Sequence, residues 1–245
     1  MHAAHENVGV SSGLAARQAC EAQRFMMPGR AQRPLHVCLI GDTAPNGSED
    51  FATILEEHWQ THDRVTSSRA FAQETDRAAE WAELDRFDCL VLMPRAVRVR
   101  KRQLEQIQAY CRRGGAIVAI RCTSQALPAW RQFHRKVLGG DHRGHCANSA
   151  ADVELVEAAR HHPVLQGVEP FASQGTLERN PKLAPDATVL LTSSFPGRMY
   201  PVAWVRPYHD GRVFYTSLGH AGDFRQRSFL RLLTNGLRWT CGPRF

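Results

Sequence analysis

The sequence predicts an α/β fold built on a mostly parallel sheet, with antiparallel strands added in its second half. Two patterns lead to this prediction. In the first half, short runs that are apolar on both faces alternate with helical repeats of apolar residues, as in parallel sheets covered by helices. In the second half, apolar runs flank turn signals such as the tetrad at residues 209–212, which is typical of hairpins.

The elements of the first half follow in order along the chain. We expect strands at residues 35–40, 87–93 and 116–120, and a weaker one at 64–67. A helix with Ser48 as its cap is predicted from the repeat Phe51, Ile54, Leu55, His58 and Trp59. A second helix carries Leu104, Ile107 and Cys111, and Gly114-Gly115 ends it.

The second half adds hairpin strands and two helices. Residues 153–156 and 188–192 read as strands, and residues 201–216 supply two more. Trp130, Phe133 and Val137 mark one face of a helix that Gly139-Gly140 closes. The final helix is expected over residues 224–239, with Asp223 as its N-cap.

The chain of 245 residues is expected to form a disordered N-terminal tail over residues 1–33 and one α/β domain over residues 34–242. The first 25 residues lack the basic and apolar regions of a secretory signal. No apolar run approaches the roughly 18 residues that a membrane helix needs, so we expect no membrane partner.

The net charge of +7 does not point to nucleic acid. The densest basic stretch holds Arg95, Arg98, Arg100, Lys101 and Arg102. No aromatic side chains interleave with these charges and no nucleic-acid motif follows, so we interpret the stretch as a solvated face. The seven cysteines include no C-x-x-C pair, which suits a reducing cytoplasm.

Candidate site residues follow the predicted parallel strands, because open parallel sheets bind ligands beyond the carboxyl ends of their strands. Asp42 follows the first strand, and Arg121, Cys122 and Thr123 follow the strand at 116–120. Ser217, Gly219 and His220 follow the last strand. Gly219 would let the backbone turn, and His220 would leave the core at the ligand-binding edge.

Two chemistries fit this edge. Arg121 could bind a carboxylate or polarise a carbonyl or hydroxyl group, with His220 moving a proton. Alternatively, Cys122 could form a Cys–His pair with His220 for acyl transfer. His142, His145, His161 and His162 match no strong metal signature. We therefore interpret those four as surface or loop histidines and expect neither a metal nor a cofactor.

The last quarter of the chain resembles the C-terminal hallmark of the ThuA-like (trehalose-utilisation) family. The resemblance rests on "PVAWVRPYHDGRVFYTSLGHAGDF" and "FLRLLTNGLRWT", with "VLGGDHRGH", "HHPVLQGVEPF" and "GTLERNPKLAPDATVLLTS" upstream in the expected order. It implies a class I glutamine-amidotransferase-like fold, which is a flavodoxin-like, three-layer sandwich. It also implies a carbohydrate or oxidised-glycoside ligand, with Thr123 and His145 lining the site.

The chain departs from the amidotransferase motifs in two places, so we expect no glutaminase activity. Aligning Gln125 with the motif's glutamine puts Arg121 on the nucleophile position, and Thr123 replaces the elbow glycine. No Pro-Glu follows His220. In addition, some family members carry an acidic "DELY" stretch where this chain has "GTLE", ending at Glu178.

We therefore expect a ThuA-like protein of the cytoplasm whose partner is a small carbohydrate-like molecule. Arg121 and His220 are the candidate catalytic residues. Asp42, Cys122, Thr123, His145, Ser217 and Gly219 are candidate ligand-binding residues. A non-catalytic binding module on the same scaffold is the alternative, and a homo-oligomer stays open.

Overall fold

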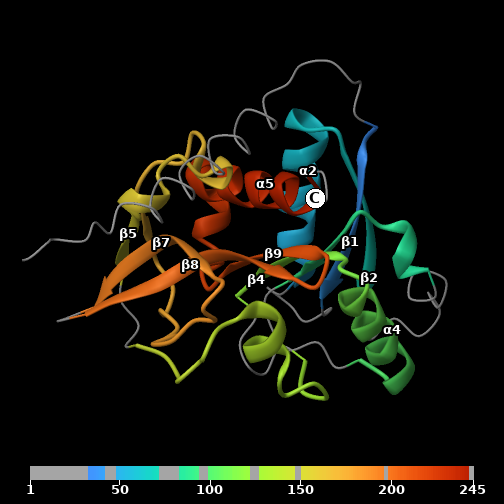
Figure 1. The fold of residues 1–245 in the computed structure, drawn as a ribbon. Coiled ribbons are helices and arrows are strands. Elements are labelled where there is room, and N and C mark those ends of the chain that lie inside the picture. The colour runs from blue at the N-terminus through green and yellow to red at the C-terminus, as the bar shows by residue number, and fades with distance from the viewer. Residues whose placement is uncertain are drawn as a thin grey trace, which may run out of the picture.

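The computed structural model describes residues 33–41, 48–71, 83–93, 99–121, 127–146, 150–195 and 198–242. These residues form one nine-stranded sheet in the order β2-β1-β3-β4-β9-β8-β7-β5-β6. The strands are β1 (Leu35–Gly41), β2 (Val65–Phe71), β3 (Cys89–Leu92), β4 (Ala116–Ile120), β5 (Ala151–Leu155), β6 (Phe171–Ser173), β7 (Thr188–Phe195), β8 (Arg198–Tyr208) and β9 (Gly211–Thr216). Figure 1 shows the sheet crossing the molecule.

The predicted division of the sheet is confirmed. Strands β2, β1, β3, β4 and β9 pair in parallel. Strands β8, β7, β5 and β6 continue the sheet with antiparallel pairs. Because β9 pairs in parallel with β4 and antiparallel with β8, it joins the two halves.

Helices cover both faces of the parallel half. Helices α2 (Ser48–His62) and α5 (Arg227–Cys241) lie on one face and α4 (Lys101–Arg112) lies on the other (Figure 1). Trp59, Phe229 and Leu233 belong to the apolar core on the first face. Ile107 and Tyr110 belong to the core on the second face. Helices therefore cover both faces of the parallel half, as the alternation of strands and helices in the sequence indicated.

Two predicted elements differ from the structure. The predicted helix through Trp130 and Val137 is only a short helical turn, η2 (His134–Leu138). Gly139 ends this turn at φ 81°, as the glycine pair suggested. The final helix begins at Arg227 instead of residue 224, because residues 223–225 form a separate 3₁₀ turn.

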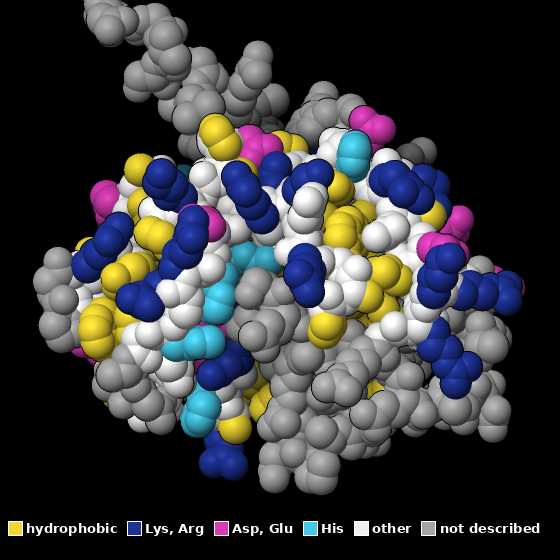
Figure 2. Space-filling view, turned by 90° about the horizontal axis from the view of Figure 1, so that it is seen from below, with side chains coloured by type: hydrophobic (Ala, Val, Ile, Leu, Met, Phe, Trp, Pro, Cys, Tyr) yellow, Lys and Arg dark blue, Asp and Glu magenta, His cyan; other side chains and the backbone are white. Residues whose placement is uncertain are grey.

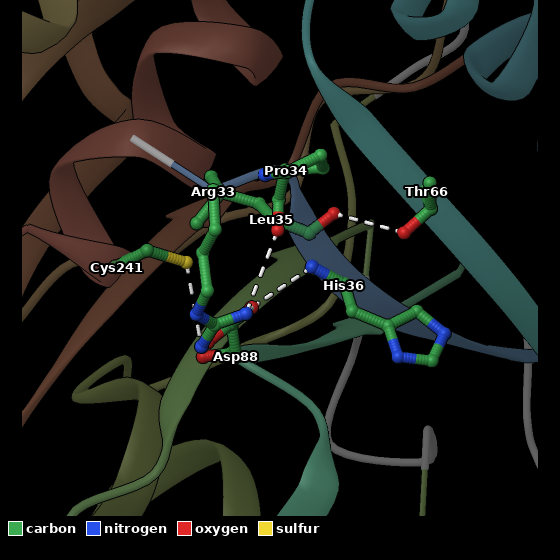
Figure 3. Close-up of polar contacts among 7 residues, drawn as sticks. All are labelled: Arg33, Pro34, Leu35, His36, Thr66, Asp88 and Cys241. Atoms are coloured by element: carbon green, nitrogen blue, oxygen red, sulfur yellow. Dashed lines mark hydrogen bonds and ion pairs between the residues drawn. The ribbon is translucent and has the colours of Figure 1, made fainter. Parts of the chain in front are cut away.

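The start of the described chain is fixed at Asp88, beyond the amino end of β3 (Figure 3). The guanidinium of Arg33 pairs with the Asp88 carboxylate. The same carboxylate accepts the backbone N–H of His36 at 2.8 Å, and the Asp88 carbonyl accepts the Cys241 thiol at 3.7 Å. Arg33 is thus tied to the fold, whereas residues 1–32 lie outside the described residues.

No helix in the part of the chain that the structure describes combines the length and apolar character needed to cross a membrane. No disulfide joins the five cysteines within that part, which are Cys38, Cys89, Cys111, Cys146 and Cys241.

Candidate ligand site at the carboxyl ends of β4 and β9

Strands β4 and β9 end side by side. Ile120 is paired with Thr216 in the parallel register, and the backbone N–H of Arg121 donates to the Thr216 carbonyl at 2.7 Å. The residues that follow the two strands therefore leave the sheet at the same edge. Arg121 comes from β4, and the segment from Ser217 to His220 comes from β9.

Arg121 has a strained backbone conformation. Its φ is 48°, in the left-handed region that residues with a Cβ rarely adopt. Such a conformation costs of order 1–3 kcal/mol and persists where the surroundings enforce it. Positive φ is also typical of the sharp strand-to-helix turn that exposes a functional side chain. The side chain of Arg121 is half-buried.

The loop after β9 is shaped by Gly219. Its φ is 128°, and a Cβ there would lie 2.8 Å from Cγ2 of Ile120. Glycine is therefore required both by the conformation and by the close approach of β4. This confirms the prediction that Gly219 gives the backbone room to turn.

Asp223 fixes this loop through hydrogen bonds to its backbone. Its Oδ2 accepts the backbone N–H groups of Gly219 and His220, each at 2.9 Å, and the hydroxyl of Ser173 at 3.0 Å. The predicted role of Asp223 as the N-cap of α5 is wrong. The N-cap position belongs to Gln226, whose side chain makes no capping bond. The buried carboxylate instead ties the β9 loop to Ser173, the last residue of β6.

The hydrogen bonds of His220 define its tautomer. The backbone N–H of Gly222 donates to Nδ1 of His220 at 3.2 Å. Nδ1 is thus an acceptor, and the neutral ring carries its proton on Nε2. Because the side chain is exposed, Nε2 is the ring atom that can exchange a proton with a ligand.

Gly175 brings Arg121 and His220 together. A Cβ on Gly175 would lie 2.9 Å from Nη1 of Arg121 and 3.0 Å from Cβ of His220. Both side chains therefore approach the same backbone atom, although they follow different strands. Gly175 lies in the segment after β6, which reaches this edge through the bond between Ser173 and Asp223.

Glu178 is a second buried acid of this region, besides Asp223. Its side chain is only 1% exposed, and its Oε2 accepts the hydroxyl of Tyr215 at 2.7 Å. Burial raises the pKa of Glu178 to about 7, although the Tyr215 hydrogen bond and the charge of Arg121 both act to lower it. Its other oxygen, Oε1, has no hydrogen-bond partner.

A polar cluster continues inward from Glu178. The ring centroids of Tyr215 and His134 are 5.5 Å apart, and Nδ1 of His134 donates to the Gly140 carbonyl at 3.0 Å. Burial lowers the pKa of His134 to about 4, so the ring is neutral at pH 7. Asn180 is fully buried beside Gly140, and neither of its amide atoms has a hydrogen-bond partner.

The other predicted site residues fall into three groups. His145 is exposed and forms an isolated backbone bridge with Glu178, so it lies at the edge of the site. Ser217 is 2% exposed and its hydroxyl donates to the Val202 carbonyl at 3.4 Å, so we assign it a structural role. Asp42, Cys122 and Thr123 lie outside the described residues.

One of the predicted surface histidines is buried. His162 is 8% exposed, and its Nδ1 accepts the backbone N–H of Val164 at 3.2 Å. It caps the 3₁₀ turn at Pro163–Leu165. His162 therefore lies in a loop, as expected, but it is buried instead of on the surface, because its ring packs against Trp239. His161 is exposed, as expected.

Histidine side chains also gather in a band on the face opposite α2 and α5, with lysine and arginine side chains on both sides of it (Figure 2). The rings of His142 and His145 are 5.0 Å apart, and His142 lies 6.0 Å from His134. In the described parts of the chain, no group of three or more His, Cys, Asp or Glu residues is arranged to hold a metal ion.

Comparison with known proteins matches this architecture to one family. The family model described as ThuA, trehalose utilisation, matches residues 41–240. A search of the curated proteins found no match.

Solved structures with the same fold include two ThuA-like proteins. The one from Parabacteroides merdae is 19% identical with a TM-score of 0.68, over 85% of this chain and 90% of the other. The one from Bacteroides uniformis is 17% identical with a TM-score of 0.67, over 87% and 95%. A cytoplasmic protein from Salmonella typhimurium is 13% identical with a TM-score of 0.60, over 84% and 99%.

The chain therefore belongs to the ThuA family, which is implicated in trehalose utilisation. The family model ends at residue 240 and so includes the whole edge formed by β4 and β9.

Proposed function

We propose that the protein binds a carbohydrate, or an oxidised derivative of a glycoside, at the site formed by Arg121 and His220 and acts on it there. The observation that carries this proposal is the convergence of both side chains on Gly175 from two neighbouring parallel strands. Membership of a family implicated in trehalose utilisation supports the class of ligand.

The geometry supports a division of labour between the two residues. A guanidinium group offers several N–H donors in a fixed plane and can polarise a carbonyl or hydroxyl oxygen. The imidazole of His220, with its proton on Nε2, would then exchange a proton with a neighbouring ligand atom. The strained backbone of Arg121 favours a functional role over a packing role.

We propose further that the fold is the flavodoxin-like, three-layer sandwich of class I glutamine amidotransferases. The parallel order β2-β1-β3-β4-β9 and the helices on both faces support this assignment. Since Arg121 occupies the position of the nucleophile, we expect no release of ammonia from glutamine. The cytoplasm, where a free-thiol protein is stable, is the proposed location.

The test compares the wild type with His220→Ala and Arg121→Lys against a panel of trehalose, D-glucose and D-glucuronate. His220 is exposed, so His220→Ala should change the unfolding free energy by no more than about 0.5 kcal/mol while removing binding. Arg121→Lys keeps the charge and loses the planar fork, so it should also weaken binding. His161→Ala, which removes an exposed histidine elsewhere, is the matched control.

Turnover separates the two functional classes. A sugar of the panel that is bound, but that neither the wild type nor any of the three variants converts, would favour the non-catalytic binding module. Binding that is unaffected by both site variants would refute the proposed site.

A further inference from the structure

Within the described parts of the chain, the charge of Arg121 has no ion-pair partner. The side chain is half-buried. Removing a charge from water without a partner is costly, and proteins usually avoid it. An unpaired and partly desolvated guanidinium on a strained backbone is therefore a reason to look for an external anion.

Glu178 is the described carboxyl group whose charge interacts with that of Arg121, but it neutralises the Arg121 charge poorly. Its side chain is almost fully buried, and Oε1 has no partner. Burial favours the protonated form, which carries no charge. In that form Glu178 can donate a hydrogen bond instead of competing with an anion for Arg121.

The remaining groups around Glu178 add no further negative charge. The hydroxyl of Tyr215, on β9, donates a hydrogen bond to Glu178. His145 forms a backbone bridge with Glu178. His134 packs against the opposite side of Tyr215, and Arg179 follows Glu178 in the chain. These neighbours are neutral or positive, and the buried Asp223 carboxylate of this edge already accepts the N–H groups of Gly219 and His220 and the Ser173 hydroxyl.

We infer that the ligand is anionic: a carbohydrate derivative carrying a carboxylate or a phosphate, whose charged group is bound by Arg121 beside Gly175 and His220. This inference rests on the proposed function and specifies its ligand class. Arg121 matches the planar geometry of a carboxylate or the oxygens of a phosphate.

The inference makes affinity dependent on pH in a definite direction. Above about pH 7, ionised Glu178 would repel the ligand and partly neutralise Arg121, so anion binding should weaken. Burial lowers the pKa of His134 to about 4 and also lowers the pKa of His142, so these two rings gain charge only in a more acidic range. Glu178→Gln isolates the first effect because the amide cannot ionise.

The experiment measures dissociation constants of D-glucuronate, glucose 6-phosphate, D-glucose and inorganic phosphate by titration calorimetry at about pH 6 and about pH 8.5. We expect glucuronate or glucose 6-phosphate to bind at least about tenfold more tightly than glucose, and Arg121→Gln to abolish that difference. Glu178→Gln should remove most of the loss of affinity at the higher pH. Arg143→Gln is the control, since Arg143 is exposed and paired with Asp141.

The outcomes distinguish the inference from the proposed function. If glucose binds as tightly as the anions and binding still depends on Arg121, the inference is wrong and the proposed function stands. If no carbohydrate binds in an Arg121-dependent way, the proposed function itself fails. If inorganic phosphate alone binds as tightly as the sugar anions, the site recognises anions in general and the carbohydrate class is wrong. The wild-type pH profile tests the direction even if Glu178→Gln does not fold.

Discussion

Arg121 illustrates, at the scale of one residue, how a site can be maintained against the preference of the backbone. Its conformation at φ 48° is one that glycine adopts without strain. The fold tolerates an arginine there because β4, the β9 loop and the segment at Gly175 surround it. This is the pattern expected when stability is given up for function.

Arg121→Gly should therefore stabilise the protein and inactivate it. Relief of the left-handed strain is expected to raise the unfolding free energy by about 1 kcal/mol, less any packing lost with the side chain. Urea unfolding and ligand titration of the same sample measure both effects. A variant that is less stable by more than about 1 kcal/mol would mean that Arg121 is held for packing.

Glu178 gives a second prediction at the residue scale. Its pKa in the folded state is raised from 4.5 to about 7, so the folded protein holds a proton that the unfolded chain loses in this range. Stability should be full below about pH 4.5, fall as the pH rises to about 7, and stay reduced above it. Glu178→Gln cannot ionise and should escape this loss, with a gain of up to about 3 kcal/mol at pH 8.

Urea unfolding of the wild type and Glu178→Gln between about pH 4 and pH 8 checks this. Two stability curves that stay parallel over the whole range would contradict the burial argument for Glu178.

At the scale of elements, the site depends on a segment that the sheet order places far from it. Strand β6 lies at the end of the sheet opposite β2, four strands from β9. The chain nevertheless returns to the carboxyl edge after β6 because Asp223 binds Ser173. Gly175 then lies against both functional side chains, those of Arg121 and His220.

Gly175→Ala should disturb the site without unfolding the protein. The new methyl group would lie 2.9 Å from Nη1 of Arg121 and 3.0 Å from Cβ of His220. The end of the Arg121 side chain can shift, whereas Cβ of His220 moves only with its backbone, which Asp223 binds. We expect ligand affinity to fall by about tenfold or more and the unfolding free energy to change by no more than about 1 kcal/mol. Gln174→Ala, at the exposed preceding residue, is the control.

Calorimetric titration with the same sugar panel measures the change. Unaltered affinity in Gly175→Ala would show that Arg121 and His220 do not need their observed spacing.

The elements also show what sequence patterns can and cannot predict. The apolar runs that became β1, β3 and β4 predicted the parallel sheet, because a strand buried on both faces needs apolar residues at every position. The same reasoning placed Arg121 and His220 at one edge. Strand β6 was missed since three residues carry no periodicity.

Long-range contacts account for the site residues that were missed. Asp223 has the residue type of a helix cap, and only the folded chain shows that its carboxylate serves the loop before it. Glu178 was noted only as a displaced acid, because nothing nearby in the sequence indicates the hydrogen bond from Tyr215, 37 residues away. Motif position alone could not supply these contacts.

For the whole molecule, the structure refines where the fold begins. The ion pair of Arg33 with Asp88 joins the start of the described chain to the region beside β3 and α5. A chain that starts at Met27 retains this pair and should melt like the full-length protein. A chain that starts at Leu35 loses it and should melt at a slightly lower temperature.

Thermal unfolding followed by circular dichroism compares the three chains, and Arg33→Gln in the full-length protein isolates the ion pair from the loss of preceding residues. A large drop for the chain that starts at Met27 would contradict the prediction that the tail is dispensable.

The central claim is that Arg121 and His220 act on the same ligand, and a double-mutant cycle tests it most directly. Affinity for the tightest-binding sugar of the panel is measured for the wild type, Arg121→Gln, His220→Ala and the double variant. Residues that share one ligand should be coupled by about 0.5 kcal/mol or more, so the double variant should lose less than the sum of the two single losses. Strictly additive losses, or full affinity in either single variant, would contradict the claim.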